Sequence, residues 1–512
     1  MGIYISVLLL SAIGIFDSLY LTYKHYHYLI PPCSVHVWFT DCGKVLRSEY
    51  AVVLGIPVAL LGVLYYAAIF LTLLTLLIRE QKKAKYILLV LSAIGFAVSI
   101  FFVIVQLLII KAICLYCIAS ALLCTSLFFI FQANFAHERR QLLLGFIAFI
   151  YKNFIRKIFF RVDPELIHRR IMLLGERLGS KSSVVHIIGS IYKTNNLMVH
   201  QTFYGISFRN PVGLAAGFDY EGRLTRLLPA LDFGFHTVGT VTNLPCKGNP
   251  RPTLGRLIKS RSLMVNKGFK NLGAAITSEK LRSFSFEIPL GISIGRTNTK
   301  QMQTQTESVE DIIKSFTTFE NSSVRHSYYE LNISCPNLYG NVSFYPPNNL
   351  KELLNEVESL RIERPVFIKM PIEKSDKEVL QMLDIIQRFS IQGVILGNLQ
   401  KDRSNKAFIR SEVEKFKVGN FSGKPTFDRS NELIQLTYRR YKGRFIIIGC
   451  GGVFSADDAY KKITLGASLV QLITGLVFEG PQLVAQINEG LVDLLKKDGL
   501  THISQAIGLR NL

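Results

Sequence analysis

Four apolar runs in the first 135 residues constrain this chain more than any other feature of the sequence. They lie at about residues 3 to 23, 51 to 78, 86 to 110 and 113 to 132. Each is close to the roughly 20 residues that a helix needs to cross a bilayer. The first run lacks the basic start and the small-residue cleavage site of a secretory signal. We therefore expect an all-α, four-helix transmembrane bundle that contacts the lipid bilayer.

The basic loop "REQKKAK", residues 79 to 85, sets the expected orientation of the bundle. Lys and Arg near the ends of spans are retained on the cytoplasmic side, so both ends of the bundle should face the cytoplasm. Residues 24 to 50 and the start of the fourth helix then lie on the outer face. We expect a multi-pass protein of the cell inner membrane, with everything after the bundle on the cytoplasmic side.

Four cysteines fall on that outer face: Cys33, Cys42, Cys114 and Cys117. Disulfides persist outside the cytoplasm, and a C-x-x-C at the start of a helix has a stabilised thiolate, so "CLYC" indicates a redox pair. Two unrelated membrane cysteines are the alternative, and Cys124, deeper in the same helix, fits that description. A zinc site is a further alternative, but no second C-x-x-C accompanies this one, and we expect no metal.

The segment "CSVHVWFTDCGKVLRSEYAVVLGIPVALLG", followed by "CLYCIASA", resembles the bacterial vitamin K epoxide reductase family. The resemblance implies that Cys33 and Cys42 form a shuttle pair, that Cys114 and Cys117 face a membrane quinone, and that Ser48 is the hydroxyl after the loop. The electron donor would be a thioredoxin-like thiol protein on the outer face. Such a relay is chemically sound, because a thiolate attacks a disulfide through a mixed disulfide.

The region after the bundle raises the question of a fifth span at residues 142 to 160. Lys152, Arg156 and Lys157 would then lie in the bilayer, at a cost of about 2.5 to 3.5 kcal/mol each near its centre. An amphipathic helix in the membrane interface fits better, because its basic residues can reach anionic headgroups. We therefore expect a membrane-surface element here, and an Asp-Pro pair at positions 163 and 164 predicts the start of a further helix.

From residue 205 onward, short β-rich runs alternate with helical stretches. Eight such runs predict an α/β TIM barrel with an N-terminal helical extension, whose chemistry would lie at the carboxyl ends of the strands. Glycines in "GCGG" and "ITG", after the last two runs, favour a phosphate site. The expected domains are residues 1–135, a linker at 136–204 and the barrel at 205–512. The runs lie at about 211 to 218, 234 to 242, 289 to 295, 327 to 334, 365 to 371, 393 to 398, 444 to 452 and 469 to 478.

The motifs "NPVGLAAGFD", "VGTVT", "NPRPTLGRL", "NISCPN", "VFIKMP", "SGKP" and "GASLVQLITGLVFEGP" resemble dihydroorotate dehydrogenase across residues 155 to 512. The upstream "VDPELIH" is similar to the membrane-associated, quinone-reducing class. The resemblance implies a bound FMN that dihydroorotate reduces and a quinone reoxidises, as a step of pyrimidine biosynthesis. The quinone would enter between the N-terminal helices.

Carried over by position, the resemblance assigns two sets of residues. A cation at Lys369 would stabilise the negative charge that the flavin gains on reduction. The plain alternative is a lysine whose stem packs in the barrel and whose head reaches water. The flavin-binding set is Ala216, Gly217, Thr240, Asn332, Lys369, Gly423, Gly451, Gly452, Ile473, Thr474 and Gly475. The substrate-binding set is Tyr220, Asn266, Lys267, Gly268, Phe269, Asn332, Asn337 and Asn398.

Cys335 occupies the position of the family's catalytic base, which takes a proton from the substrate. The membrane-associated class carries serine there, and cysteine is typical of its soluble relatives. A thiol has a far lower pKa than a hydroxyl, so cysteine is chemically competent as a base.

Other positions depart from the family pattern. Tyr220 replaces a lysine that pairs with the substrate carboxylate, while Val265 and Ser293 replace asparagines and Leu399 replaces a threonine. Lys267 could supply the missing cation from the facing loop. Two alternatives stay open: a barrel that acts on a different dihydro-compound, and a catalytically silent flavin- or ligand-binding module.

The net charge of +22 does not indicate a nucleic-acid partner. The basic residues follow the membrane loops and interface helices, and no nucleic-acid motif is present.

Overall fold

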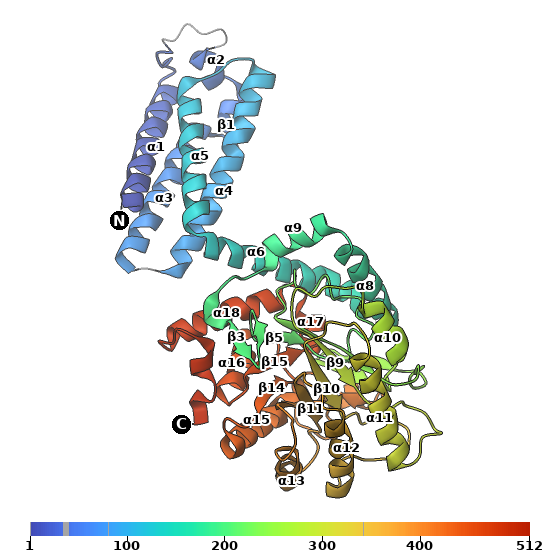
Figure 1. The fold of residues 1–512 in the computed structure, drawn as a ribbon. Coiled ribbons are helices and arrows are strands. Elements are labelled where there is room, and N and C mark those ends of the chain that lie inside the picture. The colour runs from blue at the N-terminus through green and yellow to red at the C-terminus, as the bar shows by residue number, and fades with distance from the viewer. Residues whose placement is uncertain (1, 34–39, 80, 341, 512) are drawn as a thin grey trace. The chain divides into compact units, whose positions relative to one another are not determined.

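The computed structural model describes the chain except for residues 1, 34–39, 80, 341 and 512. The chain forms two compact units, Met1–Gly145 and Phe146–Leu512 (Figure 1). The first unit is helical, and the second is built around a closed barrel.

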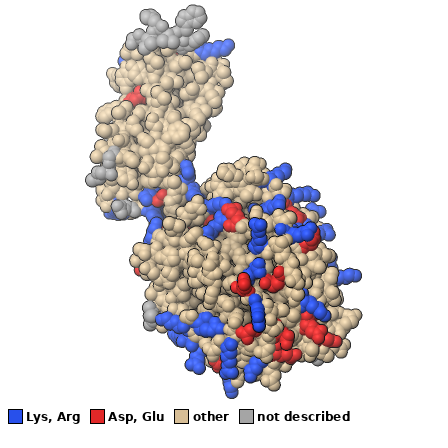
Figure 2. Space-filling view, in the orientation of Figure 1, with Lys and Arg blue, Asp and Glu red and all other residues tan. Residues whose placement is uncertain are grey.

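The first unit contains the expected four-helix transmembrane bundle, since four helices among the described residues are long and apolar enough to cross a membrane. Only 17% to 22% of the most apolar window of each helix is buried inside the protein, so most of their Leu, Ile and Phe side chains face outward. Figure 2 shows few charged side chains over this unit in the view drawn. The spanning helices are α1 (Gly2–Tyr26), α3 (Val58–Arg79), α4 (Lys82–Ile104), which continues into the π-helical η2 (Val105–Ile110), and α5 (Leu115–Asn134).

The second apolar run becomes helical only at Val58, and not at residue 51 as its hydropathy suggested. Leu54 and Gly55 both have positive φ, 53° and 81°, and form a tight turn that a helix cannot contain. The chain before α3 instead forms α2 (Cys42–Leu46), η1 (Glu49–Ala51), β1 (Val52–Val53) and β2 (Ile56–Pro57).

Helices lead from the bundle into the barrel. Asp163 caps α8 by accepting a hydrogen bond from the Leu166 amide at 2.9 Å, and Pro164 occupies the first helical position, which confirms the start predicted from the Asp-Pro pair. The elements are α6 (Ala136–Ile150), the π-helical η3 (Tyr151–Ile155), α7 (Arg156–Arg161), α8 (Pro164–Gly179), α9 (Ser182–Tyr192) and η4 (Leu197–Val199).

The second unit contains the predicted TIM barrel: eight parallel strands closed in the order β5-β6-β9-β10-β11-β12-β14-β15. The strands are buried on both faces, as expected where helices cover a parallel sheet. They are β5 (Val212–Leu214), β6 (Phe235–Val241), β9 (Leu290–Ile294), β10 (Tyr328–Asn332), β11 (Val366–Met370), β12 (Gly393–Leu396), β14 (Ile446–Cys450) and β15 (Leu469–Leu472). The helices are α10 (Ala274–Leu281), α11 (Gln305–Glu320), α12 (Pro347–Ser359), α13 (Asp376–Ile386), α14 (Arg410–Val413), α15 (Phe427–Tyr441), α16 (Ala456–Thr464), α17 (Thr474–Glu479) and α18 (Leu483–Lys497), with the 3₁₀ turns η5 (Lys424–Thr426), η6 (Ile503–Ala506) and η7 (Leu509–Asn511).

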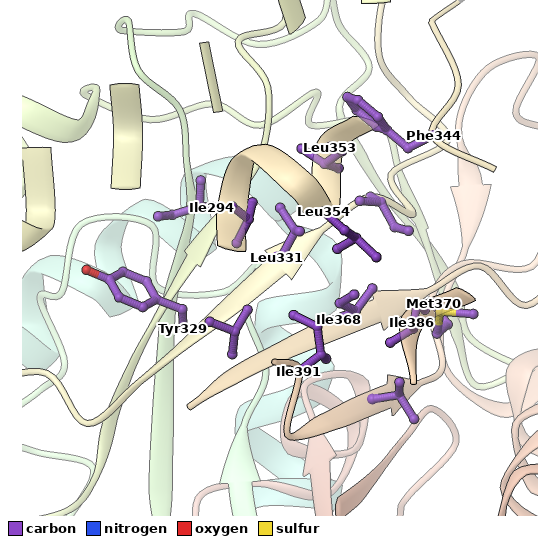
Figure 3. Packing of buried hydrophobic residues seen from close by; sticks show 14 of the residues in the cluster. Ile294, Tyr329, Leu331, Phe344, Leu353, Leu354, Ile368, Met370, Ile386 and Ile391 are labelled. Carbon is purple, nitrogen blue, oxygen red and sulfur yellow. The ribbon is translucent and has the colours of Figure 1, made fainter. Parts of the chain in front are cut away.

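The layer between strands and helices is a continuous apolar core (Figure 3). Leu331 of β10 and Ile368 of β11 are fully buried there, together with Leu353 of α12 and Ile386 of α13. Burying each such side chain contributes about 1.5 to 3 kcal/mol, so this layer fixes the strands that carry the site.

The amino-terminal end of the barrel is closed by aromatic rings. Phe208, from the hairpin of β3 (Gln201–Phe203) and β4 (Ile206–Phe208), packs edge-to-face on Phe235 with ring centroids 5.5 Å apart. Tyr328 lies 6.4 Å from Phe235 and 5.5 Å from Phe367. A Cβ at Gly213 would lie 2.3 Å from the Phe235 ring, which shows how tightly these rings fill the interior. Access to the barrel is therefore from its carboxyl end.

A small antiparallel sheet that the sequence did not predict lies outside the barrel ladder. It consists of β7 (Leu254–Leu257), β8 (Ser262–Val265) and β13 (Asn420–Phe421), in the order β13-β8-β7. The loop that begins at Val265 leaves this sheet and lines the cavity described below.

Candidate active sites

The four outer cysteines of the bundle lie in one apolar cluster. Cys33 and Cys42 are joined in a disulfide, whereas Cys114 and Cys117 are free thiols. All four pack with Val45, Ala112 and neighbouring apolar side chains. The structure thus brings together the two pairs that the sequence placed far apart along the chain.

Backbone contacts hold these cysteines in place. Asp41 accepts a hydrogen bond from the Lys44 amide at 2.9 Å and so caps α2, which begins at Cys42. The Asp41 amide donates to the Ile113 carbonyl at 3.1 Å, one residue before Cys114. The side-chain oxygen of Gln106 accepts from the Cys114 amide at 2.9 Å, so both cysteine pairs are anchored to the same short segment.

Cys124 belongs to a different environment. It is buried in the main bundle core, where its sulfur lies 3.2 Å from the Tyr66 hydroxyl, and it is not part of the outer cluster. The structure therefore separates Cys124 from the two pairs.

The barrel carries a cavity of about 580 Å³ at the carboxyl ends of its strands. Every predicted flavin-binding residue lines it, from Ala216 after β5 to Gly475 after β15. Of the predicted substrate set, Asn266 does not: its side-chain oxygen accepts a hydrogen bond from Asn249 at 2.9 Å, which directs that amide into the loop. The other members of that set all line the cavity: Tyr220, Lys267, Gly268, Phe269, Asn332, Asn337 and Asn398. The predicted base, Cys335, lines it as well.

Small residues shape one wall of the cavity. Gly423, Gly451 and Gly452 have φ values of +85°, +100° and +71°, which glycine adopts without strain. A Cβ at Gly475 would lie 2.1 Å from the Val453 carbonyl oxygen. The backbone can therefore approach a bound group closely along this wall.

Lys369 brings a positive charge to the cavity from β11. Its side chain is 6% exposed, and its ammonium lies 3.5 Å from a carboxylate oxygen of Glu330 on β10. Burial lowers the pKa of Lys369, but the nearby Glu330 carboxylate outweighs burial and holds that pKa above its ordinary value. Lys369 is thus a charged lysine, and the alternative of a lysine head in open water does not hold.

Cys335 faces the cavity just after β10. Burial raises the pKa of its thiol to about 11, although the Asn337 amide and the charges of Lys369, Arg296 and Lys401 act in the opposite direction. At neutral pH the group is mainly a thiol. The sequence argument compared the pKa of a free thiol with that of a hydroxyl. In the folded protein the Cys335 thiol ionises less readily than a free thiol, because burial removes it from water.

Amide side chains are held ready by fixed partners. Asn398 donates to the Ser334 carbonyl at 2.7 Å, and Asn337 donates to the Val265 carbonyl at 3.0 Å. Asn332 donates to the Thr240 hydroxyl at 2.8 Å. Such preorganised amides can read the edges of a planar polar ring.

Tyr220 and Lys267 line the cavity together, so the loop lysine lies on the same cavity as the tyrosine that replaces the family's cation. Burial lowers the pKa of Lys267 below its ordinary value and raises that of Tyr220. His168 of α8, which the sequence analysis did not single out, accompanies them, and burial lowers its pKa to about 4.

The far end of the same cavity is apolar and lies among the N-terminal helices of the barrel unit. Among the polar groups that line the cavity in this region are His168 and Arg256. Arg256 stacks its guanidinium over the Phe160 ring at 4.9 Å and donates to the Val162 carbonyl at 2.7 Å. The apolar lining comes from Ile155, Phe159, Ile167, Ile171, Leu174, Leu178 and Ile188.

Glu330 is a buried carboxylate that the sequence analysis missed. It is completely buried inside the barrel. The available signal was a lone charged residue in the otherwise buried strand "YYELN". A charged side chain in such a strand needs a partner of opposite charge, because burying an unpaired charge costs on the order of several kcal/mol.

The closed barrel of eight parallel strands, with one cavity at their carboxyl ends, is the arrangement of TIM-barrel enzymes. Glycines, amide side chains, a buried lysine and thiols line that cavity. The dihydroorotate dehydrogenase family model matches residues 198–495, and the vitamin K epoxide reductase family model matches residues 5–131. The chain belongs to the dihydroorotate dehydrogenase family and carries an N-terminal vitamin K epoxide reductase family domain.

Individual relatives agree. The dihydroorotate dehydrogenase (quinone) of Sulfurovum sp. (strain NBC37-1) is 34% identical over 355 residues, which are 69% of this chain and 97% of the relative. That of Trichodesmium erythraeum (strain IMS101) is 33% identical and covers 71% of this chain and 99% of the relative. The crystal structure of the Eimeria tenella enzyme in complex with ferulenol has a TM-score of 0.60 at 25% identity, and covers 68% of this chain and 96% of that one.

Proposed function

We propose that the barrel oxidises dihydroorotate to orotate with a bound FMN and passes the electrons to a membrane quinone. The observation that carries the proposal is the single cavity, which has a polar end over the strands and an apolar end among the helices. A small polar substrate and an apolar acceptor could each reach a flavin placed between these ends. The quinone-dependent relatives support the same activity.

The cavity residues fit an FMN. The glycine wall of Gly451, Gly452 and Gly475 admits a phosphate close to backbone N–H groups, and Lys369 supplies a fixed cation on the same cavity. When bound, the flavin accepts a hydride from the substrate and later gives its electrons to the quinone. Thr240 and Asn332, which hydrogen-bond one another, would hold its polar edge.

Substrate binding falls to the amides and to Lys267. Asn337 and Asn398 would contact the amide and carbonyl groups of the ring, while the Lys267 ammonium replaces the cation that is absent at Tyr220. Cys335 takes a proton from a ring carbon through its Sγ while a hydride leaves the neighbouring carbon. The barrel lining excludes water from this step, because the aromatic rings close its other end.

At the apolar end, the quinone ring would meet Arg256 and His168, both of which line the cavity. His168 is neutral at physiological pH, because burial lowers its pKa to about 4. Its Nε2 donates a hydrogen bond to the carbonyl of Phe218 at 2.9 Å. Phe218 directly follows Gly217 in the loop after β5. Arg256 can donate to a quinone carbonyl, while the neutral His168, whose N–H is given to Phe218, lines the site without adding a second charge.

The test is a spectrum of the chain purified in detergent. A flavin spectrum should appear, dihydroorotate should bleach it, and added quinone should restore it. If dithionite bleaches the flavin while saturating dihydroorotate does not, the barrel acts on another dihydro-compound. If neither dihydro-compounds nor quinone change it, the barrel is a silent binding module.

We further propose that the bundle oxidises thiols of a thioredoxin-like protein on the outer face. The donor dithiol would reduce the Cys33–Cys42 disulfide, whose thiols would in turn reduce a Cys114–Cys117 disulfide. That last pair would give two electrons and two protons to a quinone, yielding a quinol and restoring the disulfide. The shared cluster of both pairs supports this relay.

We propose a multi-pass inner-membrane location with the barrel on the cytoplasmic side. The support is the basic stretch where α3 ends and α4 begins, which contains Arg79, Lys82 and Lys83. Impermeant thiol reagents should label reduced Cys33 or Cys42 in intact cells, while a tag after residue 512 should be protected. An exposed tag would show that residues 142 to 160 span the bilayer.

A further inference from the structure

Behind the cavity, a chain of hydrogen bonds runs in one direction and ends on Glu330. The Asn332 amide donates to the Thr240 hydroxyl at 2.8 Å, and Thr240 lies 2.9 Å from the Ser293 hydroxyl. Ser293 donates to a carboxylate oxygen of Glu330 at 2.8 Å. Since the carboxylate can only accept, it orients each hydroxyl of the chain, and the cavity amide at its start. Ser293, which departs from the family's asparagine, is a link in this chain.

The same carboxylate oxygen of Glu330 lies 3.5 Å from the Lys369 ammonium. The other oxygen has no hydrogen-bond partner among the described residues. Lys369 lines the cavity, whereas Glu330 does not. The two groups thus form a buried pair whose positive end faces the cavity and whose negative end lies behind it.

We infer that Glu330 is a positioning residue that sets the reduction potential of the bound flavin by offsetting the charge of Lys369. The inference rests on the proposed FMN site. A flavin gains negative charge on reduction, and an unopposed cation beside it favours the reduced form. A carboxylate directly behind that cation weakens this effect, because Coulomb interactions in a dry site are poorly screened. The pair keeps enough positive charge at the cavity for reduction while leaving the reduced flavin able to give up its electrons.

A purely structural role for the pair makes a different prediction. A structural pair holds β10 and β11 together, so its loss changes stability and leaves the potential of the flavin where it was. The potential therefore separates the two roles, and its measurement needs neither dihydroorotate nor quinone.

The test is a reductive titration of the bound flavin in the full chain, with a reference dye. Glu330→Gln removes the negative charge at nearly constant shape, and should shift the equilibrium toward reduced flavin by at least about tenfold, which is roughly 30 mV for a two-electron couple. Asp232→Asn is the matched control, because Asp232 is also completely buried but precedes β6, at the closed end of the barrel. It should leave the potential unchanged.

The double variant Glu330→Gln/Lys369→Met keeps the inference testable if the single variant does not fold, since it leaves no unpaired buried charge. Its potential should lie below that of the wild type, because the positive end of the pair is gone. A potential of Glu330→Gln equal to or below the wild type, or a double variant at or above it, overturns the inference. Flavin that titrates as expected but is not reduced by dihydroorotate would contradict only the proposed substrate; a chain without flavin contradicts both.

Discussion

Cysteines have contrasting surroundings in the two units. In the bundle, Cys33, Cys42, Cys114 and Cys117 pack against one another in an apolar cluster. In the barrel, Cys335 stands among amides and within range of the charges of Lys369, Arg296 and Lys401. Sulfur beside sulfur suits disulfide exchange, which moves electrons. A cysteine that has cations nearby and no disulfide partner suits proton transfer. The surroundings, and not the residue type, decide the chemistry.

The comparison is tested most severely by Cys117→Ala. Removing this thiol should abolish quinone-coupled thiol oxidation, because the pair that reduces quinone can no longer form a disulfide. Dihydroorotate-to-quinone activity of the same preparation should persist. Cys124→Ala is the matched control in the same helix, since Cys124 bonds to Tyr66 in the bundle core. Equal damage from both variants would show that the pairs are wrongly assigned.

The corresponding change in the barrel is Cys335→Ala. Flavin should stay bound, but its reduction by dihydroorotate should slow by about 10² to 10⁴, the usual contribution of a general base. Stopped-flow absorbance of the flavin measures this rate, and dithionite should still bleach the variant. Cys335→Ser should recover part of the rate. Unchanged reduction in the alanine variant would remove Cys335 from the reaction.

Lys267→Ala tests the loop cation. The loss of a charge-assisted hydrogen bond to the substrate carboxylate should raise the dihydroorotate concentration needed by about tenfold to a hundredfold, which corresponds to about 1.5 to 3 kcal/mol. The maximal rate should change little. Lys270→Ala is the control, because Lys270 belongs to the same loop, is exposed and does not line the cavity. If both variants behave alike, the effect is not specific to the site.

The pH dependence should distinguish the two kinds of cysteine more finely. Burial raises the pKa of Cys335 to about 11. The base must be deprotonated, so its active fraction, and the rate of flavin reduction, should rise with pH by about tenfold per unit below that pKa. A rate that stays flat over roughly pH 6 to 9 would mean that Cys335 is not the titrating base.

The sequence predicted the main elements well where burial leaves a simple pattern. The apolar run at residues 365 to 371 became β11 (Val366–Met370), because strands buried on both faces read as continuous apolar segments. The β13-β8 pairing could not be predicted, because it joins Asn420 to Val265, two residues that lie far apart along the chain. Its register depends on tertiary packing.

The site residues also differ in how far local sequence patterns could place them. The residues assigned at strand ends, such as Lys369 and Asn332, line the cavity, and their role toward a flavin stays a prediction. Asn266 was assigned to the substrate because the family resemblance covers its loop "VNKGFKN", yet its side-chain oxygen accepts a hydrogen bond from Asn249 and it does not line the cavity. Glu330 was missed because strand periodicity reports burial but not the ion pair that makes burial of a charge possible.

The aromatic rings of Phe208, Phe235, Tyr328 and Phe367, which close the amino-terminal end of the barrel, affect how a labelled hydrogen could exchange with solvent. Because rings fill the amino-terminal end of the barrel, a hydron that Cys335 took up as the proposed base would have to leave through the open end that the substrate occupies. The hydron on Cys335 would then exchange with bulk solvent only after the substrate ring has left the cavity. A substrate labelled with deuterium at the abstracted position should therefore keep its label through reversible abstraction while it stays bound, and lose it to solvent only as orotate departs.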